Sequence, residues 1–145
     1  MTAQDILKQY FGYDSFRPGQ DELVRAILSG RDTLGIMPTG AGKSICYQVP
    51  AMLFPGLTLV ISPLISLMKD QVGALVEAGV PAACINSAMS AEEFRDALYF
   101  AGRGQYTLLY VAPERLTAPS FLEFAKRVPI SMVTVDEAHC ISQWG

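Results

Sequence analysis

The sequence predicts an α/β fold in which one parallel β-sheet carries helices on both of its faces. Short apolar segments rich in β-branched residues, such as 57–61 and 130–135, alternate along the chain with longer segments of helical periodicity. Of the 145 residues, 50% are hydrophobic and 17% are charged, and the mean hydropathy is +0.27. This length and composition suit one domain with a sizeable core. No internal repeat and no linker-like tract divides the chain.

The ends of several expected helices carry specific signals. Ser90 and Glu93 form a capping-box pattern before an amphipathic segment. Pro18 suits a first helical turn, and Gly30 suits the position after a last one. Pro50 is expected to kink or end the helix that contains it. Helices are expected at 3–10, 21–28, 43–53, 62–79, 90–100 and 118–127, and strands at 32–36, 57–61, 81–85, 106–111 and 130–135.

Bulk properties argue against several classes of protein. No apolar run reaches the roughly 20 residues of a membrane-spanning helix, and residues 1–5 lack the pattern of a signal peptide. Cys46, Cys84 and Cys140 lie far apart, which fits neither a zinc site nor a disulfide framework and is typical of a reducing cytosol. The net charge of −3 and the pI near 5.0 argue against a protein that grips nucleic acid mainly by bulk positive charge.

A glycine-rich segment, 37–44, lies between an expected strand and an expected helix. Gly40 and Gly42 allow backbone N–H groups to converge on one point, at which the following helix also aims its unpaired N-terminal amides. Lys43 supplies a mobile positive charge for the β- and γ-phosphates of a nucleotide, and the Ser44 hydroxyl is a suitable Mg²⁺ ligand. The segment therefore predicts a phosphate-binding loop.

Met37 departs from the strict G-x-x-x-x-G-K-[ST] pattern, which has a glycine at that position. An alternative interpretation is an ordinary glycine-rich turn before a helix. The loop can still form, because Pro38 fixes φ and Gly40 accepts a positive φ.

Two carboxylates, Asp136 and Glu137, follow the expected strand at 130–135. Ligands of open α/β sheets bind at the carboxyl ends of the strands. Asp136 can hold Mg²⁺ through its water shell, and Glu137 can polarise the attacking water. In isolation this pair is an ordinary solvated turn, but together with the glycine-rich segment it favours nucleotide hydrolysis. His139, the one histidine of the chain, is either a polar turn residue or a hydrogen-bonding group that relays hydrolysis to another element.

The segment 11–20 carries a weaker signal. It can be a capped turn between two helices. It can also recognise a base, since Gln20 offers a donor and an acceptor together, as the edge of adenine does. Arg17 or Tyr13 could stack on that base.

Taken together, these segments resemble the motifs of the RecQ-family DNA helicases of helicase superfamily 2. The resemblance covers essentially the whole chain in the family's motif order, and family members also lack the glycine that Met37 replaces. Segment 11–20 resembles motif 0, 37–44 motif I, 62–71 motif Ia, 110–116 motif Ib, 136–139 motif II, and 140–145 the start of the aromatic-rich loop that senses single-stranded DNA.

The resemblance implies a RecA-like P-loop NTPase fold, ATP and Mg²⁺ as cofactors, and single-stranded DNA or a duplex junction as partner. It implies catalytic roles for Lys43 and Glu137, a coupling role for His139, and Mg²⁺ binding by Ser44 and Asp136. The implied nucleotide contacts are Tyr13, Arg17, Gln20, Thr39, Gly40, Ala41, Gly42, Lys43 and Ser44. The implied DNA contacts are Ser62, Pro63, Leu64, Pro113, Glu114, Arg115 and Trp144, the last by stacking.

By the same resemblance, residues 1–145 are the N-terminal part of a first motor domain, truncated within the aromatic-rich loop. Motif III, whose strand sits between the strands of motifs I and II in the family, and the second motor domain with its arginine finger would follow. So would a zinc-binding region and a winged helix. The expected parent is an ATP-dependent 3′–5′ DNA helicase of DNA repair or recombination, in the bacterial cytoplasm at the nucleoid or in a eukaryotic nucleus.

Two alternatives stay open. A P-loop kinase or simple NTPase would explain Lys43 and Asp136 but leaves segments 11–20, 62–71 and 110–116 without a role. A non-enzymatic nucleotide- or DNA-binding fragment is the other. The sequence predicts no oligomeric state.

Overall fold

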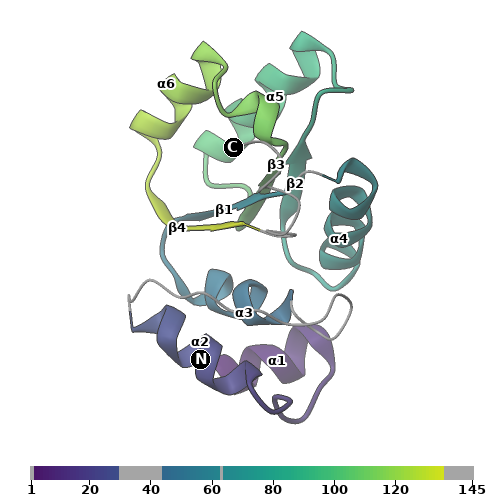
Figure 1. Ribbon diagram of the computed structural model, residues 1–145, viewed down its shortest axis with the longest axis vertical. Coiled ribbons are helices and arrows are strands. Elements are labelled where there is room, and N and C mark those ends of the chain that lie inside the picture. Colours follow the sequence, from purple (N-terminus) through teal and green to yellow (C-terminus); the bar gives the residue numbers. More distant parts are fainter. Residues whose placement is uncertain (1, 30–43, 63, 136–145) are drawn as a thin grey trace. The chain divides into compact units, whose positions relative to one another are not determined.

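The computed structural model describes residues 2–29, 44–62 and 64–135 of the chain (Figure 1). The chain divides into two compact units, residues 1–55 and 56–145. Each unit has a hydrophobic cluster of its own.

The described part of the N-terminal unit is helical. Ile6 and Leu7 of its first helix are buried together with Ile45 and Val49 of its third. Residues four apart lie on one face of a helix, so Ile45 and Val49 present a single apolar stripe to this cluster. The helices are α1 (Ala3–Phe11), α2 (Gln20–Leu28) and α3 (Ile45–Leu53).

Both ends of α1 are set by local sequence. The Thr2 hydroxyl accepts a hydrogen bond from the Asp5 N–H (3.1 Å), and the Asp5 carboxylate accepts one from the Thr2 N–H (3.0 Å), which completes a capping box. These hydrogen bonds, chiefly that from the Thr2 backbone, lower the pKa of the Asp5 carboxyl. Gly12 ends the helix in the left-handed region (φ 78°), where a residue with a Cβ would be strained.

One expectation for this unit is confirmed and one is wrong. The third helix ends at Leu53, as expected, and Pro50 does not end it, since the Phe54 N–H still donates to the Pro50 carbonyl (3.2 Å). Proline withholds only its own N–H, so the helix loses one hydrogen bond and keeps the rest. Pro18 is not in the first turn of α2, because Gly19 (φ 90°) is the N-cap and Pro18 precedes it.

The described residues of the C-terminal unit form a four-stranded sheet in the order β2-β3-β1-β4, with every pair of neighbours parallel (Figure 1). The predicted parallel sheet is therefore confirmed, and two strands have the bounds expected from the sequence. The strand expected at 32–36 lies outside the described residues. The strands are β1 (Leu57–Ile61), β2 (Ala82–Ile85), β3 (Leu108–Val111) and β4 (Ile130–Val135).

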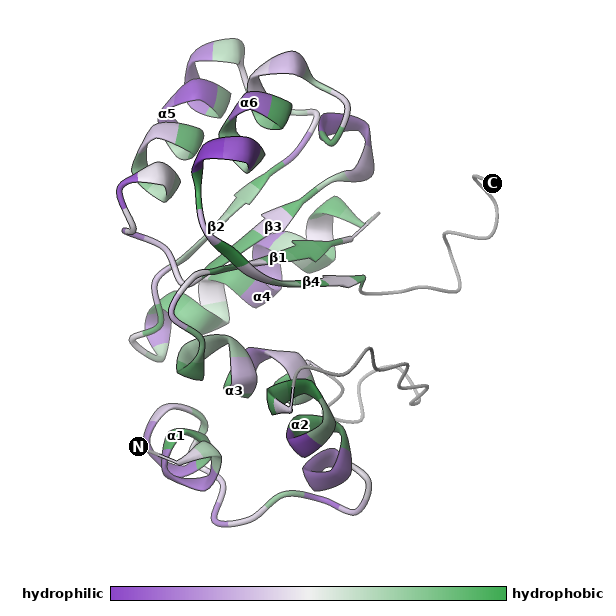
Figure 2. Ribbon diagram, turned by 90° about the vertical axis from the view of Figure 1, so that its left-hand side faces the viewer, coloured by the Kyte–Doolittle hydropathy of each residue, from purple (hydrophilic) through white to green (hydrophobic). Residues whose placement is uncertain are grey.

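Helices cover both faces of this sheet, as the sequence predicts. Figures 1 and 2 show α5 and α6 together on one face and α4 on the opposite face. The capping box of α5 is confirmed, since the Glu93 N–H donates to the Ser90 hydroxyl (3.1 Å) and the Ser90 N–H to the Glu93 carboxylate (3.0 Å). The elements are α4 (Ile65–Glu77), α5 (Ala91–Gly102), the short 3₁₀ helix η1 (Pro113–Arg115) and α6 (Pro119–Arg127).

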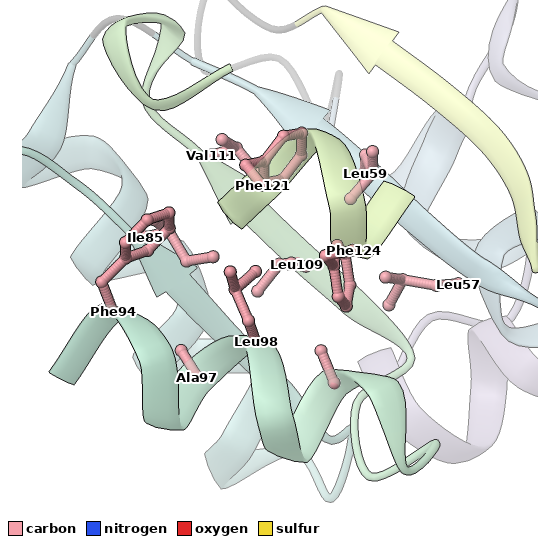
Figure 3. Packing of buried hydrophobic residues seen from close by; sticks show 11 residues of the cluster. Leu57, Leu59, Ile85, Phe94, Ala97, Leu98, Leu109, Val111, Phe121 and Phe124 are labelled. Atoms are coloured by element: carbon pink, nitrogen blue, oxygen red, sulfur yellow. The ribbon is translucent and has the colours of Figure 1, made fainter. Parts of the chain in front are cut away.

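The core of the C-terminal unit fills the space between the sheet and helices α5 and α6 (Figure 3). Leu109 and Val111 share one face of β3, because strand residues two apart point to the same side. Phe121 and Phe124 of α6 pack against them with ring centroids 5.8 Å apart. The loops that follow the strands therefore extend from a well-packed core.

Gly56→Ala is expected to destabilise the fold. A Cβ here would lie 2.6 Å from the Ser131 hydroxyl and 2.8 Å from the Pro129 carbonyl oxygen. The Gly56 N–H also donates to that hydroxyl (2.8 Å). We expect a loss of about 1–3 kcal/mol in the free energy of unfolding, measured by urea titration. Gly73→Ala in α4 is the matched control, since no atom lies within 4 Å of its Cβ, and alanine favours a helix. Equal stability of the two variants would contradict the close approach at Gly56.

Candidate functional site

The carboxyl ends of the four strands lie along one edge of the sheet, because all strands run in the same direction. At this edge the Ser62 N–H donates to the Val111 carbonyl (3.1 Å), and the Ala112 N–H donates to the Ile85 carbonyl (2.8 Å). The residues that directly follow β1 and β3 therefore lie side by side. These are two of the three segments for which the sequence predicts DNA contacts; the third contains Trp144.

The end of β4 lies at the same level. Val135, the last residue of this strand, pairs with Ile61, the last residue of β1. The predicted Mg²⁺ ligand and the predicted catalytic carboxylate follow Val135 directly in the sequence. Parallel pairing thus brings the end of the motif II strand next to Ser62.

Among the predicted DNA contacts that the structure describes, Arg115 is the most tightly held. Its Nε donates to the Asn86 carbonyl (3.1 Å) and its terminal nitrogen to the Met89 carbonyl (3.0 Å). The guanidinium also lies over the Phe94 ring, 4.6 Å from the centroid. Arg115 therefore ties η1 to the loop that joins β2 to α5.

Asn86, which sequence reasoning missed, organises that loop. It is only 2% exposed, and its side-chain carbonyl accepts from the Ala88 N–H (2.9 Å). Its side-chain amide donates to the Cys84 sulfur (3.8 Å), and its backbone N–H donates to the Met89 sulfur (3.3 Å). The sequence does carry a signal for this role. An asparagine that follows an apolar run commonly forms a turn in which its side chain accepts a hydrogen bond from the backbone two residues later.

The other predicted DNA contacts differ in exposure. Leu64, the N-cap of α4, and Glu114 are exposed, and Pro113 is partly buried. Ser62 is buried, and its hydroxyl finds no hydrogen-bond partner in the part of the chain that the structure describes. Leu64 and Glu114 can thus meet a ligand as they stand, whereas the Ser62 side chain cannot.

The predicted adenine contacts lie in one turn of the N-terminal unit. The Arg17 N–H donates to the side-chain carbonyl of Gln20 (2.7 Å), and the Gln20 N–H donates to the Arg17 carbonyl (3.0 Å). This reciprocal pair fixes the Gln20 amide, which is 2% exposed. Tyr13 is 48% exposed, so its ring is open to a stacking partner. Gln4, which sequence reasoning missed, supports the turn by donating to the Asp14 carbonyl (3.0 Å).

Ser44, a predicted Mg²⁺ ligand, is the N-cap of α3. Its backbone angles are helical (φ −64°, ψ −29°), and its hydroxyl makes no capping hydrogen bond to the helix. Its role as a metal ligand stays a prediction.

The remaining predicted site residues lie outside the described residues. Within the described part of the chain, no group of three His, Cys, Asp or Glu side chains could hold a metal ion. Burial raises the pKa of the Cys46 and Cys84 thiols, so neither has the thiolate character of a nucleophile. The predicted residues outside the described ranges are Thr39, Gly40, Ala41, Gly42, Lys43, Pro63, Asp136, Glu137, His139 and Trp144.

The described helices include none that is long and apolar enough to cross a membrane.

Comparison with known proteins places the chain among helicases. The profile of the DEAD/DEAH box helicases matches residues 17–145. Over 144 residues the chain is 56% identical to the ATP-dependent DNA helicase RecQ of Bacillus subtilis. This alignment covers 99% of this chain and 24% of that protein. The ATP-dependent DNA helicase RecQ of Haemophilus influenzae is 51% identical, with 99% of this chain and 23% of the relative covered.

Solved structures show the same fold at low identity. A hypothetical ATP-dependent RNA helicase from Sulfolobus tokodaii superposes with a TM-score of 0.77 at 18% identity, covering 99% of this chain and 43% of that one. These matches confirm the RecA-like helicase fold. The chain spans about a quarter of the length of the RecQ relatives. The chain therefore belongs to the DEAD/DEAH box helicase family, and its resemblance to the RecQ-family ATP-dependent DNA helicases is confirmed.

Proposed function

We propose that this chain is the ATP-binding part of a 3′–5′ DNA helicase that couples ATP hydrolysis to DNA unwinding. The observation that carries the proposal is the shared sheet edge, where the end of β1 lies between the ends of β3 and β4. Ligands of open α/β sheets bind at such an edge. The relatives named as DNA helicases support DNA as the polymer, and none of the observed geometry favours a kinase.

ATP would be held at two places in this proposal. The turn 13–20 would recognise adenine, with Tyr13 or Arg17 stacking on the base and the buried Gln20 amide, held by the Arg17 N–H, fixing the shape of the turn. Residues 39–43 would bind the phosphates, with Lys43 supplying the cation. Ser44 and Asp136 would hold Mg²⁺, which when bound neutralises charge on the phosphates. Glu137 would orient and deprotonate the attacking water.

DNA would run along the sheet edge. Leu64 and Glu114 are exposed there, and Arg115 holds η1 against the loop after β2 so that its backbone is pre-shaped. Trp144 would stack on a base, and His139 would relay the state of the nucleotide site to this surface. The parent would serve DNA repair or recombination.

Replacing Glu137 separates catalysis from binding. In the full-length parent, Glu137→Gln keeps the side-chain shape but loses basicity, so ATP and Mg²⁺ binding should persist while turnover falls by roughly 10²–10⁴-fold. Lys43→Ala is the contrasting variant, for which both nucleotide affinity and turnover should fall. Calorimetry and steady-state ATPase assays measure the two quantities. Parallel loss of binding and turnover in Glu137→Gln would instead place Glu137 in metal or fold support.

Arg115→Lys tests how the segment after β3 acts. Lysine keeps the charge but cannot reproduce the two carbonyl contacts and the ring contact together. We expect a loss of roughly 1–3 kcal/mol in stability together with weaker binding of single-stranded DNA. Arg127→Lys is the control, because Arg127 makes no hydrogen bond or ion pair with another described residue. An unchanged melting temperature with weaker DNA binding would make Arg115 a direct DNA contact only.

The isolated 145-residue chain is expected to unwind no DNA and to show little or no DNA-stimulated ATPase. Unwinding requires two motor domains that close on ATP and open after hydrolysis. An arginine finger supplied by the second domain contributes roughly 10³–10⁵ in rate in related nucleotidases. A tailed-duplex assay compares the chain with its full-length parent. ATP-dependent unwinding by the purified, monomeric chain would refute this expectation. An ATPase rate of the full-length parent that does not change on addition of single-stranded DNA would refute the helicase proposal itself.

A further inference from the structure

A cleft of about 570 Å³ lies between α5 and α6, which Figures 1 and 2 both show side by side. Its floor is apolar. Leu98 and Phe124 point from the two helices into the core beneath it and are 8% and 1% exposed. Gly102 keeps the cleft open at one end, since a Cβ there would meet only a methyl group of Val128, at 3.8 Å.

Three arginines line the cleft. Arg95 lies on α5, Arg103 is the C-cap of the same helix, and Arg127 is the last residue of α6. Arg95 and Arg103 are eight residues apart, which corresponds to roughly 12 Å along a helix. Glu123 is the one acidic residue in the lining. The lining therefore carries three positive charges against one negative, although the whole chain has a net charge of −3.

These arginines are not neutralised within the described structure. The ion pair formed among the described residues joins Arg25 to Asp21, in the other unit. Arg103 donates to the Tyr99 hydroxyl (3.2 Å) and lies over the Tyr99 ring, 5.6 Å from the centroid, which orients the guanidinium without neutralising it. Arg95 and Arg127 are exposed. An oriented, unpaired guanidinium favours a carboxylate, which it can bind through two parallel hydrogen bonds.

We propose that this cleft binds an extended acidic peptide, with one carboxylate on Arg95, a second on Arg103 and Arg127, and an apolar side chain between them. Residues one and five of an extended chain are roughly 13 Å apart at 3.3 Å per residue, which matches the spacing of Arg95 and Arg103. Positions one, three and five share one face of such a chain. The middle side chain therefore meets the apolar floor.

A nucleic-acid backbone fits this surface less well. Its phosphates recur at every residue, and the backbone offers no apolar group to the floor over Leu98 and Phe124. The peptide-binding cleft is independent of the helicase proposal, because none of its lining residues belongs to the nucleotide site or to the DNA path.

The test is binding of a labelled peptide to the full-length protein, measured by fluorescence anisotropy. The probe has aspartate at positions one and five, phenylalanine at position three and serine between them. We expect saturable binding that weakens at least about fivefold when both aspartates are asparagine. The double variant Arg103→Ala and Arg127→Ala should show a similar loss, since the charged contacts are removed from the protein side.

Three further variants separate shape from charge. Gly102→Leu fills the cleft and keeps every arginine, so binding should be lost, with the melting curve as the check on folding. Lys126→Ala is the control for loss of a positive charge outside the cleft, because Lys126 is exposed on α6 but does not line the cleft, and binding should be unchanged. Arg103→Glu should prefer a probe with lysine at one end over the original.

Several results would overturn the proposal. One is equal affinity for the aspartate and asparagine probes, and another is full binding by a folded Gly102→Leu variant. Absence of saturable binding of the aspartate probe would also overturn it. Displacement of the probe by single-stranded DNA through the same arginines would make the cleft a nucleic-acid site.

Discussion

Parallel pairing of β1 with both β3 and β4 is the constraint on which the candidate site depends. Ile61 pairs with Val111 on one side and with Val135 on the other. Three chain segments that are far apart in sequence therefore leave the sheet at one level. Because no strand runs in the opposite direction in the described sheet, every loop at this edge follows a strand end. A ligand there can be reached from several motifs at once.

In each of the two units, polar groups in or beside the predicted site segments fix the local fold. Arg115 donates two hydrogen bonds to main-chain carbonyls. The Asn86 side chain accepts from the Ala88 N–H, and the Gln20 side chain accepts from the Arg17 N–H. Loops leave backbone groups without the partners that a helix or a sheet provides, and buried ones must be satisfied. A residue of a functional motif can thus contribute to ligand binding indirectly, because it fixes the shape of the backbone around the site.

The helices that cover the sheet have two distinct faces. Phe94 and Leu98 of α5 and Phe124 of α6 are buried against the strands, whereas Arg95 and Tyr99 are exposed. This division follows from the helical period, which turns neighbouring residues to different sides. The same packing that stabilises the core therefore sets the spacing of the charged groups outside it, and it leaves a cleft where Gly102 contributes no side chain.

The sequence by itself determined the features that depend on near neighbours. The capping box at Ser90 and the strands at 57–61 and 130–135 were predicted from local pattern and are confirmed, and the motif set predicted the helicase family. The roles of residues 39–43 and 136–144 stay predictions. Tertiary structure alone decided the strand order, the contacts of Arg115 with a loop 26 and 29 residues away, and the arginines around the cleft. The physical reason is that periodicity records which side of an element is apolar, whereas it carries no information on which distant element will cover that side.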